Sequence, residues 1–272
     1  MAAKQELARF LIERLEGIED RKPLIHHITN MVVMNETANA TLCMGALPVM
    51  AHAREEVEEM ATQAQALVVN MGTPYPELEE SMILAGRAAN RAGVPVILDP
   101  VGTGATTYRT SLALRLTEEI NFAVVRGNAA EMAVLAGEKA EIRGVESLSV
   151  SGEAGYTAQG VASRLGCVAA VTGEVDTVVD GGRLARIGNG HPLLGRVTGT
   201  GCMATTAIAV MLAGGEPYFE ATVAALAFFG LAGQRAAGSS GRLPGNLHVE
   251  IYNELYILSR YRKLKGLKID ME

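Results

Sequence analysis

Residues 94–104 read VPVILDPVGTG, a short apolar run that stops at an aspartate and continues into a loop with two glycines. The run at residues 94–98 is too short for a typical helix and has no polar alternation, so it predicts a strand buried on both faces. Such strands belong to parallel sheets, where ligands bind beyond the carboxyl ends of the strands. We therefore expect residues 99–104 at a ligand-binding edge.

The same alternation of short apolar runs and longer helical patterns continues through the first two thirds of the chain. Strands are predicted at residues 24–28, 47–50, 66–70, 94–98, 122–125 and 168–172. Helices are predicted at residues 31–44, 54–63, 77–92, 111–119, 129–136 and 157–165. Helices that connect buried parallel strands cover both faces of the sheet. The expected fold class is α/β, a three-layer α/β/α arrangement around a mostly parallel, doubly wound sheet.

The pattern changes after Thr172. Residues 176–180 and 183–187 flank Gly181-Gly182 and predict a β-hairpin. Three helices are then predicted, at residues 202–212, 218–236 and 249–264. Because no linker or internal repeat is visible, we expect one domain over residues 1–272.

Charge and cysteine content exclude several classes of protein. The 272 residues include 24 Lys and Arg against 30 Asp and Glu, and a net charge of −6 excludes a dominant surface for nucleic acid. The three cysteines have no CxxC spacing, so they predict neither a disulfide framework nor a zinc site. Residues 1–17 predict a charged amphipathic helix rather than a signal peptide, and no apolar run approaches the roughly 20 residues of a membrane span. We expect a cytoplasmic protein without membrane association.

Glycine is in excess, at 30 of 272 residues, and it gathers in loops that follow predicted strands. Four such loops are NMGT at residues 70–73, DPVGTG at 99–104, RGNAAE at 126–131 and TGE at 172–174. They would face one edge of the sheet with acids and an arginine that suit a phosphate and its metal. Each loop alone is also typical of ordinary turns and helix caps.

A fifth glycine cluster, VTGTGCMA at residues 197–204, runs directly into a predicted helix. Gly199 and Gly201 let a ligand approach the backbone, and the first helical turn offers N–H groups to an anion, for which phosphate is the expected ligand. Cys202 lies in that turn, where the helix dipole favours a thiolate that accepts a proton from a substrate hydroxyl. The alternative is that Cys202 is a small buried apolar residue. The absence of a GxxxxGK[ST] motif excludes a P-loop phosphotransferase, and a Rossmann interpretation lacks the preceding strand.

The five histidines show no spacing typical of metal ligands. His26 and His27 are adjacent on a predicted strand and would point to opposite faces of the sheet. We expect structural roles for them.

Taken together, these segments resemble the hydroxyethylthiazole kinases of thiamine salvage, a family of the ribokinase-like superfamily. The matching segments are PLIHHITN (23–30), VMNETAN (33–39), PVMA (48–51), LDPVG (98–102), RGNAAE (126–131), VTGE (171–174) and VTGTGC (197–202). They span nearly the whole chain in the family's order. The resemblance implies transfer of the γ-phosphoryl group of ATP to the hydroxyl of 4-methyl-5-(2-hydroxyethyl)thiazole, with Mg²⁺.

The resemblance also implies which residues bind the nucleotide and its metal. Arg126 and Thr172 match positions that contact ATP, and Gly201 would offer its amide to the phosphates. Asp99 and Glu131 match acidic positions near the triphosphate and its magnesium.

For the acceptor, the resemblance implies a second group of residues. Met50 and Gly199 match positions that contact the thiazole, and Asn30 would lie close to both ligands. Cys202 matches the residue proposed as catalytic base, where most ribokinase-like kinases have Asp.

Members of the family are trimers with the thiazole site between subunits. The resemblance therefore implies that residues 30–38 of one chain lie near Met50 or Gly199 of a neighbour. Leu47 departs from the Ser that is common in the family, Gln234 from Glu, and residues 242–247 from a GPGSF-like turn. These departures leave the phosphate-binding loops unchanged and concern acceptor preference more than the type of reaction.

Three alternatives remain open. A ribokinase-like nucleotide-hydrate dehydratase would be expected to have Asp in place of Cys202. A non-catalytic module that binds a small molecule would not need Arg126, Glu131 and Cys202 together. A kinase of the same superfamily could act on another small alcohol, a hydroxymethylpyrimidine or a sugar.

Overall fold

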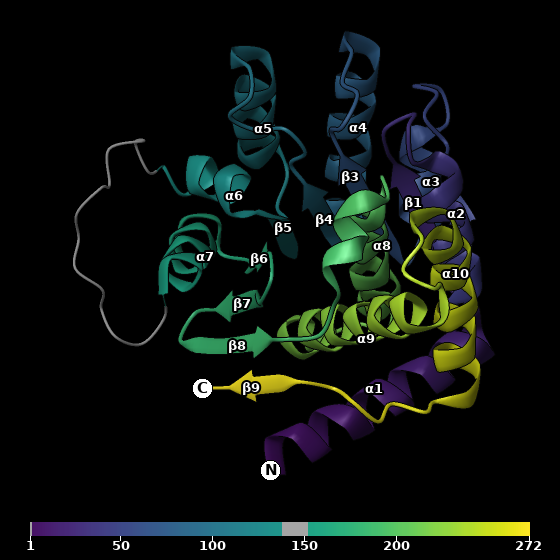
Figure 1. Ribbon diagram of the computed structural model, residues 1–272. Coiled ribbons are helices and arrows are strands. Elements are labelled where there is room, and N and C mark those ends of the chain that lie inside the picture. Colours follow the sequence, from purple (N-terminus) through teal and green to yellow (C-terminus); the bar gives the residue numbers. More distant parts are fainter. Residues whose placement is uncertain (1, 138–151) are drawn as a thin grey trace.

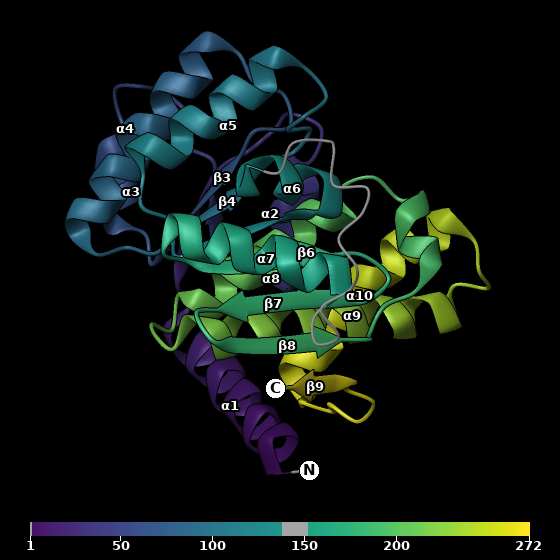
Figure 2. The ribbon, with the colours of Figure 1, turned by 90° about the vertical axis from the view of Figure 1, so that its left-hand side faces the viewer.

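The apolar runs form one nine-stranded sheet in the computed structural model, which describes residues 2–137 and 152–272 (Figure 1). The strands are β1 (Leu24–Ile28), β2 (Leu47–Val49), β3 (Ala66–Asn70), β4 (Val96–Asp99), β5 (Val124–Asn128), β6 (Val168–Thr172), β7 (Asp176–Asp180), β8 (Arg183–Ile187) and β9 (Ile269–Met271). Their order in the sheet is β2-β1-β3-β4-β5-β6-β7-β8-β9. All pairs from β2 to β6 are parallel, and β7, β8 and β9 add an antiparallel end, which Figure 2 brings to the front.

Helices cover both faces of this sheet, as the alternating sequence pattern predicts. One face is covered by α3 (Val57–Gln63), α4 (Pro76–Ala92), α5 (Thr107–Glu119), α6 (Ala129–Ala136) and α7 (Gly152–Leu165). The other is covered by α1 (Ala2–Arg21), α2 (Met34–Cys43), α8 (Thr200–Leu212), α9 (Tyr218–Ser239) and α10 (Pro244–Tyr261). A 3₁₀ turn, η1 (Pro192–Arg196), precedes α8. Over residues 2–137 and 152–272, the helices include none with the length and apolar character needed to span a bilayer.

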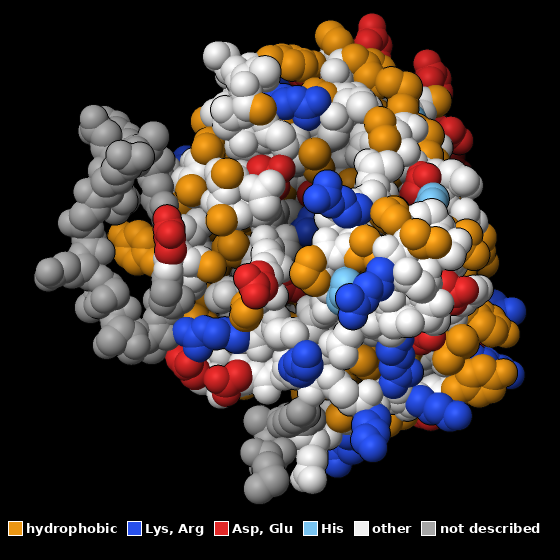
Figure 3. All heavy atoms as spheres, in the orientation of Figure 1, with side chains coloured by type: hydrophobic (Ala, Val, Ile, Leu, Met, Phe, Trp, Pro, Cys, Tyr) orange, Lys and Arg blue, Asp and Glu red, His pale blue; other side chains and the backbone are white. Residues whose placement is uncertain are grey.

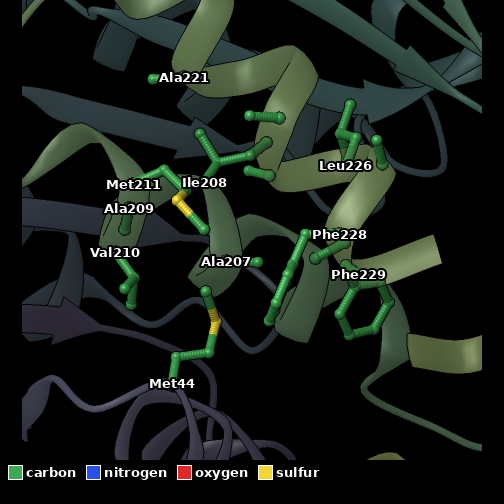
Figure 4. Packing of buried hydrophobic residues seen from close by; sticks show 14 of the residues in the cluster. Met44, Ala207, Ile208, Ala209, Val210, Met211, Ala221, Leu226, Phe228 and Phe229 are labelled. Carbon is green, nitrogen blue, oxygen red and sulfur yellow. The ribbon is translucent and has the colours of Figure 1, made fainter. Parts of the chain in front are cut away.

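Side chains of the strands divide between two hydrophobic cores. In β3, Val68 belongs to the core shared with α8 and α9, whereas Leu67 and Val69 belong to the core under α4. This division follows from the two-residue repeat of a strand, which points neighbouring side chains to opposite faces. Figure 4 shows the first core, where Ile208 and Met211 of α8 and Phe228 of α9 are among the buried residues. Apolar burial on both faces therefore holds the parallel strands in the centre of the molecule.

The prediction of an α/β fold with a parallel sheet is confirmed, but several boundaries are wrong. Helix α5 begins at Thr107 rather than at residue 111, because the Thr106 side chain accepts a hydrogen bond from the Arg109 N–H and caps the helix. Helix α10 begins at Pro244, which needs no donor in the first turn, and ends at Tyr261 rather than at residue 264. Strand β5 continues to Asn128, so Arg126 lies within a strand and not in a loop. Strand β9 was not predicted, since three residues that include Asp270 carry no strand pattern.

His26 and His27 are both fully buried in β1 and both have structural partners, as the sequence predicts. His26 Nε2 lies 2.8 Å from the Ala51 carbonyl oxygen, and His27 Nε2 lies 3.1 Å from Thr41 Oγ1. Burial lowers the pKa of His26 to about 4 and that of His27 to about 3. Both imidazoles are therefore neutral in the folded protein at physiological pH.

The depressed pKa of His27 predicts an acid-dependent loss of stability. Below an unfolded-state pKa of about 6.5, only the unfolded chain takes up this proton, so the free energy of unfolding falls as the pH falls. Between about pH 6 and pH 4, it should fall more steeply in the wild type than in a His27→Asn variant, by about 1.4 kcal/mol per pH unit. Urea unfolding of both proteins at several pH values measures how the free energy of unfolding changes with pH. A comparison at pH 8, where His27 is neutral in both states, gives the cost of the substitution itself. Equal slopes for the wild type and the variant would contradict the prediction.

Candidate active site

The residues that the sequence singles out gather at the carboxyl edge of the parallel strands. Asn30 follows β1, and Asn70 and Asp99 are the last residues of β3 and β4 and lie directly opposite each other in the sheet. Arg126 lies in β5, and Thr172 is the last residue of β6. The parallel topology brings them to one edge because all five strand ends point the same way.

A buried carboxylate lies at the centre of this edge. Asp99 is 1% exposed, and its Oδ2 accepts hydrogen bonds from Asn70 Nδ2 at 2.8 Å and from Thr205 Oγ1 at 2.9 Å. Its Oδ1 has no hydrogen-bond partner, although Arg126 Nη1 lies 3.8 Å away. Burial raises the pKa of Asp99, and the nearby guanidinium of Arg126 opposes that rise.

Cys202 lies in the first turn of α8, beside this carboxylate. Its Sγ is 3.2 Å from Asn70 Nδ2 and 3.8 Å from Asn30 Nδ2, and both amides donate toward the sulfur. Burial and the charge of Asp99 raise the pKa of the thiol to about 12, and the two amides and Arg126 oppose the rise. The expectation of a lowered pKa is therefore wrong, since desolvation outweighs the helix N-terminus. The alternative, that Cys202 is only a small buried apolar residue, does not account for the hydrogen bonds that its sulfur accepts.

The two glycines at the start of α8 are needed for different reasons. Gly199 has a φ of 85°, a left-handed conformation that favours glycine, and a Cβ there would lie 3.1 Å from Val33. A Cβ at Gly201 would lie 3.0 Å from Arg126 Nη1, so the guanidinium packs directly over the helix start. The helix start and Arg126 together present N–H groups and a positive charge to one place.

A cavity of about 820 Å³ opens next to this cluster. Arg126, Thr172 and Gly201 line it, together with residues 188–192 and Phe229 of α9. Asp176 also lines it, and burial raises the pKa of that carboxyl to about 6. Three of the four residues expected at ATP, Arg126, Thr172 and Gly201, thus line one cavity. The fourth, Asn30, lies in the adjoining hydrogen-bonded cluster, in which Asn70 links Asp99 and Cys202.

Beside one wall of the cavity, α9 has two glycines, Gly230 and Gly233, that let a neighbouring segment lie close to the helix backbone. A Cβ at Gly230 would lie 2.7 Å from the Asn189 carbonyl oxygen, and a Cβ at Gly233 would lie 2.8 Å from the Leu194 side chain. The loop that contains Asn189 can approach the helix only because both positions are glycine. Asn189 is further held by its hydrogen bonds to the Gly266 carbonyl and the Lys268 N–H.

Glu131 and Met50 differ from the other candidates in their surroundings. The carboxylate of Glu131 accepts from the N–H groups of Gly102 at 2.8 Å and Asn128 at 2.9 Å, in a capping box at the start of α6. Glu131 therefore holds the loop after β4 in place. Met50 directly follows the edge strand β2, is only partly exposed, and is not among the residues that line the cavity.

These residues provide a partial oxygen site for a metal. Asp99 has one buried oxygen without a partner, which fits a cation ligand, and each Glu131 oxygen already accepts a backbone N–H. In the described part of the chain, no group of three or more His, Cys, Asp and Glu could hold an ion. Mg²⁺ commonly binds through one or two carboxylates together with substrate phosphates, rather than in a cage made only of protein ligands. The few oxygen ligands present here fit that kind of magnesium site.

A second cavity, of about 540 Å³, lies at the opposite, amino edge of the strands. Its charged residues include Arg183, which pairs with Asp180 and with Glu220 at 2.6 Å. Its main cation is thus already neutralised by two carboxylates.

Sequence reasoning missed two residues that complete the cluster. Asn70 belongs to the NMGT segment at residues 70–73, which the sequence marks by its glycine. An asparagine after a strand is typical of many turns, so Asn70 itself was not singled out. Thr205 carries no signal in the sequence beyond its place one turn after Cys202. Only the folded structure shows that both donate to Asp99.

The parallel sheet with a glycine-led helix start at its carboxyl edge is the ribokinase-like fold. A ribokinase-like superfamily protein from Enterococcus faecalis aligns with a TM-score of 0.63 over 85% of this chain and 86% of its own, and at 14% identity this likeness concerns the fold alone. The sequence model of the hydroxyethylthiazole kinase family matches residues 15–260, and the chain belongs to this family.

Two further relatives agree with that assignment over nearly their whole length. The hydroxyethylthiazole kinase of Thermoanaerobacter pseudethanolicus is 49% identical over 96% of this chain and 99% of its own. The structure of the hydroxyethylthiazole kinase protein from Pyrococcus horikoshii OT3 has a TM-score of 0.88 at 42% identity, over 97% of this chain and 99% of its own. The resemblance stated from the sequence is thereby confirmed.

Proposed function

We propose that this chain transfers the γ-phosphoryl group of ATP to the primary hydroxyl of 4-methyl-5-(2-hydroxyethyl)thiazole. The observation that carries the proposal is the hydrogen-bonded cluster of Asn30, Asp99 and Cys202 next to a cavity lined by Arg126 and Gly201. Membership of the hydroxyethylthiazole kinase family selects the acceptor among small alcohols. Phosphoryl transfer depends mainly on positioning and charge neutralisation, which these groups supply.

The nucleotide would occupy the cavity of about 820 Å³, with its phosphates toward α8. Gly201 and its neighbours offer N–H groups at the helix start, Arg126 adds a cation that does not titrate, and Thr172 borders the same space. Glu174 and Asp176 line the cavity as well. A triphosphate beside these carboxyls needs additional positive charge.

Mg²⁺ would supply that charge, with Asp99 as its protein ligand through Oδ1 and Glu131 nearby. The unpartnered, buried oxygen of Asp99 supports this assignment. When bound, the ion would neutralise charge that develops on the transferred phosphoryl group. Glu131 would contribute mainly by holding the loop at Gly102, since both of its oxygens accept N–H groups.

The acceptor would lie on the other side of the cluster, with its hydroxyl at Cys202. Gly199, Asn30 and Met50 are proposed to contact the thiazole, and the sulfur of Cys202 to accept the hydroxyl proton. Because burial keeps this sulfur protonated at neutral pH, its basic form is a minority before substrate binds.

We further propose that the chain forms a homotrimer through the side of the molecule near β2. Strand β2 is an edge of the sheet, and α2 and α10 pack against each other beside it. Six large hydrophobic residues are exposed in this region: Met31, Val32, Leu42, Leu47, Val249 and Tyr256. Figure 3 shows hydrophobic side chains in orange at its right-hand edge, where α10 lies in Figure 1. Exposed apolar residues gathered on one side are typical of a subunit interface.

One expectation about the trimer changes with the structure. Gly199 packs against Val33 and Glu36 of its own chain, so a neighbour is not needed to bring residues 30–38 to Gly199. What a neighbouring subunit would add to this side of the site is Met50, at the edge of the sheet.

The proposed reaction is tested by measuring ADP formation with three acceptors in parallel, 4-methyl-5-(2-hydroxyethyl)thiazole, a hydroxymethylpyrimidine and ribose. Turnover should depend on the thiazole, with the other two at least about tenfold slower, because a pocket that matches one alcohol discriminates by 1.4 kcal/mol or more. Phosphorylated thiazole is identified by mass spectrometry. Silence with the thiazole would refute the function, whereas turnover with the pyrimidine or ribose alone would indicate the alternative acceptors.

Replacement of Cys202 by Ala should lower kcat by about 10²-fold to 10⁴-fold, the range of a lost general base, and raise KM much less. The wild-type kcat should also rise from pH 6 to pH 9, because the small thiolate fraction grows throughout this range below a pKa of about 12, and this rise should be missing in the variant. Cys43→Ala, a change at the end of α2, is the matched control and should stay within about twofold of the wild type. An unchanged kcat in Cys202→Ala would exclude the role of base.

Sedimentation velocity tests the trimer, and the wild type should sediment as three copies of the chain. Leu47→Lys adds a charge to the edge strand β2 and should weaken the trimer at least tenfold, because an unpaired charge becomes buried at the interface. Tyr156→Lys on α7, which packs beside β6 and β7 far from β2 in the strand order, should leave the trimer intact. A wild-type monomer at micromolar concentration would contradict the proposal.

A further inference from the structure

The side-chain amide of Asn70 contacts four partners at the end of β3. Its Nδ2 donates to Asp99 Oδ2 at 2.8 Å and to Cys202 Sγ at 3.2 Å. Its Oδ1 accepts from Asn30 Nδ2 at 2.8 Å and from the backbone N–H of Gly72 at 3.0 Å. An amide group has two donors and two lone pairs, so Asn70 uses its full capacity.

These partners determine which way the amide faces. The Gly72 N–H can only donate, so it must face Oδ1, and the Asp99 carboxylate accepts from the opposite side. Asn70 is 1% exposed, and a buried amide that turned away would leave several groups without partners. The N–H that points at Cys202 is therefore fixed by the other three contacts.

The fixed N–H of Asn70 restricts the direction of the S–H bond of Cys202. A sulfur that accepts from Asn70 directs its own S–H away from that amide, and an N–H donor stabilises a sulfur that carries negative charge. Asn30 reaches the same sulfur from 3.8 Å and is itself held by Asn70. Gly72 makes room for Asn30, since a Cβ there would lie 2.5 Å from Asn30 Nδ2.

We propose that Asn70 is a positioning residue, whose amide holds the sulfur of Cys202 at a fixed place relative to the carboxylate of Asp99. The inference rests on the catalytic role proposed for Cys202. It assigns a function to the end of β3, where the family resemblance places no site residue. Asn70 acts on the reaction through Cys202 and need not touch the substrate.

A double-mutant cycle with Cys202→Ala tests this role. In the wild-type background, Asn70→Asp should lower kcat about tenfold or more, because the replacement keeps the shape and an oxygen toward Gly72 but removes the N–H groups that face the sulfur and Asp99. KM for the thiazole alcohol should change by less than about threefold. In the Cys202→Ala background, the same substitution should lower kcat by a factor at least about threefold smaller, because only its effect through Asp99 is left.

Thr205→Val is the matched comparison. The Thr205 hydroxyl donates to the same oxygen of Asp99 as Asn70 does, at 2.9 Å, and its other contact is the Gly201 carbonyl at 3.5 Å. An effect that passes through Asp99 should lower kcat by the same factor with and without Cys202. Thermal unfolding and ATP affinity show whether each variant folds. If Asn70→Asp does not fold, Asn70→Ser is measured in the same cycle, since its shorter side chain cannot hydrogen-bond to both Asp99 and the sulfur.

The outcomes separate the two hypotheses. An equal loss of kcat from the Asn70 substitution in both backgrounds, or an unchanged kcat in a folded Asn70 variant, would overturn the positioning role. An unchanged kcat in Cys202→Ala alone would instead refute the proposed base, on which the inference rests.

Discussion

The buried carboxylate of Asp99 is the group on which the arrangement of the site depends. A carboxyl group that is 1% exposed is costly to bury unless polar partners surround it, and here β3, β5 and α8 each supply one. Asn70 and Thr205 satisfy one oxygen, and Arg126 balances the charge from a greater distance. These contacts link the ends of three neighbouring strands to the first turns of α8. The geometry at Cys202 follows from that link.

The electrostatics of the site result from local contributions that oppose one another. A protein of net charge −6 still presents a positive region where Arg126 packs over the start of α8. At the same helix start, the pKa of Cys202 is raised, because burial and the charge of Asp99 both disfavour the thiolate. A guanidinium and a weakly acidic thiol therefore lie beside the same first turn of one helix.

The elements of the fold that bury apolar residues could be predicted from the sequence, since their periodicity reports directly on burial. β3 and α4 are examples, where an unbroken apolar run and a helical pattern correspond to observed elements. β9 could not be predicted, because it exists only by pairing with β8 from a distant part of the chain. For the site, Arg126 and Cys202 stood out in motifs. The partners Asn70 and Thr205 and the direction of the pKa shift at Cys202 depend on tertiary neighbours that no local pattern encodes.

Gly230 and Gly233 of α9 lie at the wall of the cavity of about 820 Å³ or directly behind it. Asn189 and Leu194 lie close to the helix at these two positions, and Asn189, Leu194 and Gly230 all line the cavity. A single added methyl group at either position would push Asn189 or Leu194 away from the helix and so change the width of the cavity. The width of the cavity therefore depends on two glycines of a core helix as well as on residues that stand out in the sequence motifs.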